Sequence, residues 1–148
     1  MNAHSVRILD TVIILIALGG LGLAPLRAAE PWSAKELKDP AALAANLADA
    51  KAPQPVILNI GSVEQIKGAV AIGPTGVQEK FDKLKQHLAN LPRDKEVIIY
   101  CGCCPFRRCP NIRPAFSLLK RMKFTKARLL NLPTSLKDDW IIKGYPME

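Results

Sequence analysis

The sequence predicts an α/β domain with a central, mostly parallel sheet flanked by helices. Two observations support this prediction. Short apolar runs rich in β-branched residues have the length and composition of buried strands, at residues 56–60, 69–72, 96–100 and 127–132. Helix-forming stretches separate most of these runs. Strands that alternate with helices favour βαβ units, and such units pair their strands in parallel.

The helices are indicated by their start and stop signals as well as by periodicity. Ser33 and Glu36 have the spacing of a capping box, and Pro40 suits the first turn of a further helix. The clearest amphipathic pattern runs over residues 77–91, where apolar side chains recur at helical spacing with lysines between them. Another helix is expected over residues 115–122, and a short one near the C-terminus.

Residues 1–28 are expected to lie outside the fold. Arg7 precedes an apolar run over residues 11–26, and small residues follow at Ala28. This order is typical of a secretory signal peptide, and the run is short beside the roughly 20 apolar residues of a membrane span. We therefore predict an exported, periplasmic or extracellular protein with one domain over residues 29–148. The alternative is an uncleaved N-terminal anchor, the only form in which membrane contact is expected.

Composition narrows the classes of partner. The 148 residues are enough for one domain with its own core, and the net charge of +8 comes mostly from the second half of the chain. Such a charge suits a solvated basic face or a positive field that attracts small anions. Aromatic residues are sparse and no DNA-reading element is recognisable, so no nucleic-acid partner is expected. We expect a monomer.

All four cysteines lie within ten residues, in the run Cys101-Gly102-Cys103-Cys104-Pro105-Phe106-Arg107-Arg108-Cys109-Pro110. This loop follows a predicted strand and precedes a predicted helix. A thiol placed there faces loop N–H groups and a helix N-terminus, which favour its thiolate form. Disulfides among such close cysteines would close only tiny loops and add little stability. The clustering therefore favours chemistry or metal binding over scaffolding.

Three stretches, taken in order, resemble a rhodanese-like domain, and the resemblance runs from Trp32 to Pro146. Residues 56–60 followed by residues 66–72 look like the first strand of that family and its Ile-x-Gly-Ala turn. Residues 97–101 look like the strand that leads into the active-site cysteine. The C-terminal segment is similar to the family's Trp-x(3)-Gly-x-Pro ending, with Trp140, Gly144 and Pro146.

The resemblance implies a sulfurtransferase that needs no cofactor. Cys101 would be the nucleophile: it would take the outer sulfur of an anionic donor such as thiosulfate, hold it as a persulfide and pass it to a thiol or protein acceptor. Arg107 would orient the anionic substrate. The rest of the loop would bind the substrate, through Gly102, Cys103, Cys104, Pro105, Phe106 and Arg108.

The loop and its surroundings also depart from the family pattern. Asn59 and Gly61 stand where the family commonly has Asp-x-Arg. The seven-residue Cys-x(5)-Arg loop from Cys101 to Arg107 is one residue longer than the usual sulfurtransferase loop. That length resembles the phosphatase and arsenate-reductase relatives of the fold. Tyr100 replaces the histidine that usually precedes the cysteine of those relatives.

Other interpretations of the same loop remain open. Cys101 and Cys104 form a Cys-x-x-Cys pair suited to thiol–disulfide exchange. An arsenate-type reductase would use Cys103, Cys104 or Cys109 as the resolving thiol. With oxidised cysteines, the domain would be a catalytically silent binding module. The spacing Cys-x-Cys-Cys-x(4)-Cys lacks the two separated Cys-x(2)-Cys pairs of common metal sites, so no metal is expected. If the loop did bind a metal, capture of Cu(I) would be the most credible case.

Overall fold

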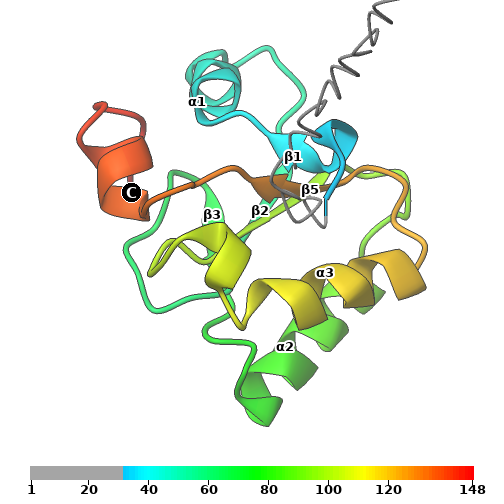
Figure 1. Cartoon of the computed structure of the whole chain (residues 1–148). Coiled ribbons are helices and arrows are strands. Elements are labelled where there is room, and N and C mark those ends of the chain that lie inside the picture. The colour runs from blue at the N-terminus through cyan, green and yellow to red at the C-terminus, as the bar shows by residue number, and fades with distance from the viewer. Residues whose placement is uncertain (1–31) are drawn as a thin grey trace, which may run out of the picture.

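The computed structural model describes residues 32–148, which contain one parallel sheet with helices on both faces (Figure 1). The order of its five strands is β1-β5-β4-β2-β3, and every neighbouring pair is parallel. The strands are β1 (Leu37–Lys38), β2 (Val56–Asn59), β3 (Ala69–Ala71), β4 (Val97–Tyr100) and β5 (Ala127–Leu130). The predicted α/β class with a parallel sheet is confirmed.

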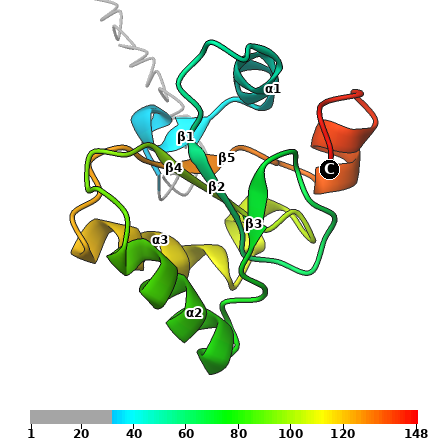
Figure 2. The ribbon, with the colours of Figure 1, turned by 180° about the vertical axis from the view of Figure 1, so that it is seen from behind.

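Helices cover both faces of the sheet. The α-helices are α1 (Pro40–Ala48), α2 (Gln78–Ala89) and α3 (Ile112–Arg121). Three shorter helical turns are η1 (Ala34–Glu36), η2 (Phe106–Arg108) and η3 (Lys137–Ile141), of which the last has π-helical hydrogen bonding. Figures 1 and 2 show α2 and α3 on one face of the sheet, and α1 with the C-terminal turn on the other.

The N-terminal elements follow their local signals only in part. Ser33 and Glu36 form the predicted capping box, yet the helix that they begin is a single 3₁₀ turn, because the chain extends at once into β1. This two-residue strand pairs with β5, with Leu37 opposite Leu129, and it is too short to show in the sequence. Asp39 then caps α1, since its Oδ1 accepts a hydrogen bond from the Ala42 N–H at 2.9 Å.

The sheet is buried on both faces, as its continuous apolar strands require. Along β4, Val97 and Ile99 pack with α2 and α3, whereas Ile98 and Tyr100 pack with α1 and the C-terminal turn. Successive side chains of a strand point to opposite faces, so the residue after Tyr100 returns to the α2–α3 side. Cys101 accordingly lies in the core under α3.

The C-terminal segment closes the α1 side of the sheet. Trp140 is fully buried, and its Nε1 donates a hydrogen bond to the Pro146 carbonyl at 3.1 Å. The Tyr145 ring meets the indole edge-on with the centroids 5.2 Å apart. Gly144 turns the chain between them with a φ of +69°. These contacts give the Trp-x(3)-Gly-x-Pro pattern a structural role.

The direction of the strand connections reverses between β2 and β4. The connections from β1 through α1 to β2, and from β2 to β3, step across the sheet in one direction. The connections through α2 and α3 step back over the opposite face. Where two adjacent strands send their connections to opposite faces, a crevice forms outside their carboxyl ends, and ligands of such sheets bind there. Cys101 directly follows β4 at this point.

Gly61, just beyond the end of β2, packs directly against Cys101. A Cβ on Gly61 would lie 2.3 Å from the Cys101 carbonyl oxygen and 2.9 Å from Cys101 Sγ. Asn59 shapes this turn: its Oδ1 accepts from the Gly61 N–H at 3.0 Å and its Nδ2 donates to the Val63 carbonyl at 2.9 Å. Asn59 therefore holds Gly61 against Cys101.

The predicted signal or anchor over residues 1–28 lies outside the described residues. Within residues 32–148, no helix combines the length and the apolar character needed to cross a bilayer.

Replacing Gly61 with alanine should destabilise the fold, because the new methyl group overlaps the Cys101 backbone and sulfur. We expect the free energy of unfolding to fall by about 1–3 kcal/mol, the usual cost of overpacking. Urea unfolding followed by circular dichroism measures it. Ser62→Ala, at the exposed neighbouring residue, is the control and should leave the unfolding curve unchanged. Equal stability of Gly61→Ala and wild type would contradict the close contact.

Candidate functional site

Three cysteine sulfurs converge at the carboxyl end of β4. The Sγ atoms of Cys101, Cys103 and Cys109 all lie within 4.8 Å of one another. The Sγ atoms of Cys101 and Cys103 are 3.2 Å apart, and Cys103 Sγ in turn lies 3.6 Å from Cys104 Sγ. All four thiols are free. Cys101 and Cys109 are each 1% exposed, whereas Cys103 is exposed to solvent.

The loop is folded back by contacts to the C-terminal segment. Gly102 has a φ of +70°, and a Cβ there would lie 2.7 Å from Leu136 Cβ. The Gly102 carbonyl accepts from the Leu136 N–H at 2.9 Å, and the Phe106 N–H donates to the Leu132 carbonyl at 3.3 Å. With these two contacts fixed, the chain turns through η2. Cys109, at the end of that turn, then lies close to Cys101.

Asn111 contacts the same sulfur and was not predicted from the sequence. Its Nδ2 donates a hydrogen bond to Cys101 Sγ at 3.3 Å. The side chain is held in place because its Oδ1 accepts a hydrogen bond from the Gly76 N–H at 2.8 Å, and the backbone is held because the Asn111 backbone carbonyl accepts one from Thr75 Oγ1 at 2.8 Å. The sequence offers one local indication that Asn111 could contribute to the site, namely its position immediately before α3.

These neighbours make Cys101 the thiolate of the cluster. Its pKa is lowered to about 5, first by the hydrogen bond with the Cys109 thiol and then by Asn111 and Cys103, against the opposing effect of burial. The Cys109 pKa is raised, mainly because its proton is held in the bond to Cys101. Burial and the neighbouring sulfurs raise the pKa of Cys103 to about 12. At neutral pH, therefore, one negative charge rests on Cys101 between two protonated thiols.

The two arginines of the predicted site lie on η2. Arg107 and Arg108 are both exposed, and the Arg107 guanidinium carbon is 5.9 Å from the centroid of the Phe106 ring. Phe106 itself is buried, with its ring 5.3 Å from that of Trp32. Pro105, exposed, begins the turn. The aromatic pair thus anchors a turn that displays positive charge beside the cysteines.

Tyr100 takes no part in the sulfur chemistry. Its side chain is fully buried on the α1 side of the sheet, away from the core that holds Cys101. The hydroxyl donates to the Glu64 carbonyl at 3.2 Å and accepts from the Ile66 N–H at 3.1 Å. Burial raises its pKa to about 12, so the phenol stays protonated. It serves to hold the connection between β2 and β3.

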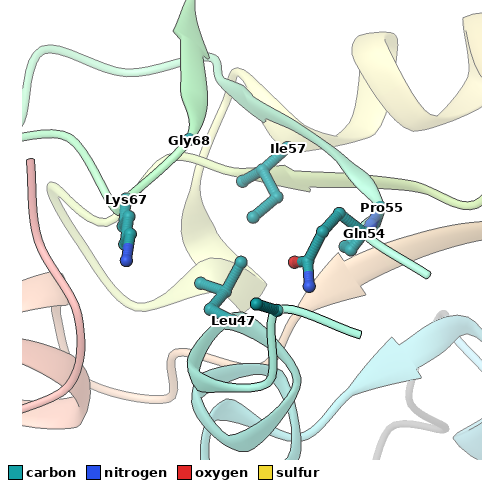
Figure 3. Close-up of a pocket in the computed structure, with 7 residues that line it drawn as sticks. Leu47, Gln54, Pro55, Ile57, Lys67 and Gly68 are labelled. Atoms are coloured by element: carbon teal, nitrogen blue, oxygen red, sulfur yellow. The ribbon is translucent and has the colours of Figure 1, made fainter. Parts of the chain in front are cut away.

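A pocket of about 310 Å³ lies elsewhere, between the end of α1 and strands β2 and β3 (Figure 3). Leu47 and Ile57 form its apolar walls, while Gln54 and Lys67 stand at its margin. As formed by the described residues, its lining holds neither a thiol nor a carboxylate. The pocket therefore lacks the thiol chemistry of the cysteine loop.

Comparisons with known proteins bear on the fold only. No protein-family model matches the chain, and no curated protein matches it. The structure is similar to the crystal structure of the Alr3790 protein from Anabaena sp., with a TM-score of 0.54 and 20% sequence identity. The match covers 75% of this chain and 90% of that one. It supports the α/β architecture.

Replacing Asn111 with leucine should raise the Cys101 pKa, because it removes an N–H donor from the thiolate. A hydrogen bond to a charged group contributes about 1.5–3 kcal/mol, which corresponds to about one to two pH units. We expect the midpoint of Cys101 alkylation by iodoacetamide to move upward from about pH 5 by that amount. Fragment mass spectrometry assigns the label to Cys101.

The control makes the same change at Asn90, an exposed residue at the end of α2, and should leave the alkylation midpoint in place. An Asn111→Leu midpoint equal to that of the wild type would show that the amide does not stabilise the thiolate.

Proposed function

We propose that this chain is a rhodanese-like sulfurtransferase that carries sulfur as a persulfide on Cys101. The observation that carries the proposal is the hydrogen-bonded thiolate: Cys101 Sγ lies at the carboxyl end of β4, where β4 adjoins β2, with donors from Asn111 and Cys109. A sulfur anion held by fixed donors suits both the nucleophile and the persulfide that it forms. The sequence resemblance to the family supports the same activity.

The reaction conserves atoms and charge. The Cys101 thiolate attacks the outer sulfur of thiosulfate, forming a bond from Sγ to that sulfur. The sulfur–sulfur bond of thiosulfate breaks, and sulfite leaves with the electron pair. Cys101 then carries a persulfide anion, and a thiophilic acceptor such as cyanide removes its outer sulfur to restore the thiolate. No metal, cofactor or external proton is needed for either step.

The surroundings support an anionic donor. Arg107 and Arg108 are exposed on η2, and Arg113 is exposed on the first turn of α3. Together they provide a positive field that attracts small anions. Because only 1% of Cys101 is exposed, the donor reaches Sγ past the exposed Cys103 thiol. We further propose, from the N-terminal pattern, that the protein acts outside the cytosol. We also propose that it acts as a monomer.

Thiol–disulfide exchange is the second candidate, favoured by the 3.2 Å contact between Cys101 and Cys103. Cys101 would attack a substrate disulfide and form a mixed disulfide, which Cys103 would resolve. The two thiols would be oxidised to one disulfide and the substrate reduced to two thiols. The cysteine in contact with Cys101 is Cys103, whereas Cys104 contacts Cys103. The exchanging pair would therefore be Cys101 and Cys103, and not the Cys101 and Cys104 of the Cys-x-x-Cys motif.

Sulfur loading can be tested by intact mass. Reduced protein incubated with thiosulfate should gain one sulfur atom, located on Cys101 by fragmentation and removed by cyanide. Cys101→Ser should abolish the gain, because it removes the nucleophile, while Cys104→Ser should keep it. No added sulfur on the wild-type protein, or full loading of Cys101→Ser, would rule the assignment out.

The second candidate makes a different prediction. Mild oxidation by a small disulfide should remove two hydrogens from the wild-type protein and leave a bond between Cys101 and Cys103. An intramolecular disulfide should form at least about tenfold more slowly in Cys103→Ser, which lacks the thiol in contact with Cys101 Sγ, than in Cys104→Ser. Equal oxidation rates of these two variants would exclude Cys103 as the resolving thiol.

A further inference from the structure

The convergence of three thiols has a use beyond carrying sulfur. Cys101 and Cys109 approach one another from the two ends of the loop, and Cys103 closes the third side. We propose that Cys101, Cys103 and Cys109 form a trigonal all-sulfur site that binds one Cu(I) ion.

The separations of the sulfur atoms fit one metal ion. A metal–sulfur bond of about 2.3 Å in a trigonal plane places the three sulfurs about 4 Å from one another. The Cys101 and Cys103 sulfurs are 3.2 Å apart, and every separation among the three is within 4.8 Å. Each sulfur would move by less than about 1 Å from its present position to reach that spacing. Cys103, exposed on a loop, is the ligand that can move most easily.

The set of ligands selects the metal. Thiolates are soft ligands that favour Cu(I), whereas structural Zn²⁺ sites use four ligands in a tetrahedron. Within residues 32–148, the cluster has three members, and no histidine or carboxylate belongs to it. Cys104 touches Cys103 but lies outside the cluster. Three sulfurs without a fourth partner suit the low coordination number of Cu(I).

Burial separates this cluster from an ordinary surface group of cysteines. Cys101 and Cys109 are each 1% exposed and lie in the core under α3, so the protein would shield a bound ion on two sides. Cys103 stands at the exposed side, where a copper ion would be received from a small thiol or another protein by exchange of ligands. A bound ion would occupy the Cys101 sulfur and so prevent the persulfide from forming.

The experiment titrates the reduced full chain with Cu(I) under nitrogen, in competition with a Cu(I)-specific chelator of known affinity. We expect one ion per chain by native mass spectrometry and three sulfur neighbours by X-ray absorption at the copper edge. Cys103→Ser should weaken binding by at least about a hundredfold, beyond the ~10–100-fold effect of losing a supporting residue. Cys104→Ser is the matched control and should bind as tightly as wild type.

The outcomes separate this inference from the proposed function. A copper affinity that falls equally in Cys103→Ser and Cys104→Ser, or a site with two sulfur neighbours, would overturn the trigonal site. Cys103 is exposed, so its serine variant should fold, which circular dichroism checks. Sulfur loading is measured separately, on the copper-free wild-type protein treated with thiosulfate. Loss of sulfur loading with copper binding intact would count against the sulfurtransferase only.

Discussion

The parallel pairing of β2 with β4 sets the position of the reactive sulfur. In this register Asn59 lies opposite Tyr100, so Gly61 and Cys101 meet directly beyond the last hydrogen bonds of the two strands. The two connections then leave toward opposite faces of the sheet, and the space between them is where a ligand can approach. A side chain larger than hydrogen at Gly61 would push the cysteine out of this place.

A buried thiolate needs donors, because burial alone raises the pKa of a thiol. Cys109 and Asn111 supply them, the first from the end of the loop and the second from the start of α3. Asn111 is held in turn by Thr75 and Gly76, which precede α2. Elements from three parts of the chain therefore fix the charge on a single atom.

The proposed sulfur transfer and the proposed copper binding would use the same atoms in different ways. Persulfide chemistry needs one nucleophilic sulfur with donors around it. Metal binding needs three sulfurs that can lose their protons and turn toward a common point. Cys101 with its donors would meet the first requirement, and the convergence of Cys101, Cys103 and Cys109 within 4.8 Å of one another would meet the geometric part of the second.

The sequence by itself determined the α/β class, most of the strands and helices, and the position of Cys101 after a strand, because periodicity, β-branched runs and prolines act locally. It did not reveal β1, whose two residues are defined only by pairing with β5. The linear cysteine spacing also argued against a metal site, and Asn111 carried no distinctive signal. The sulfur cluster and the Asn111 contact both depend on the way the loop folds back. Two hydrogen bonds impose this path, one from the Leu136 N–H to the Gly102 carbonyl and one from the Phe106 N–H to the Leu132 carbonyl. Such bonds join residues about 30 positions apart, so only the tertiary structure could decide which side chains face Cys101.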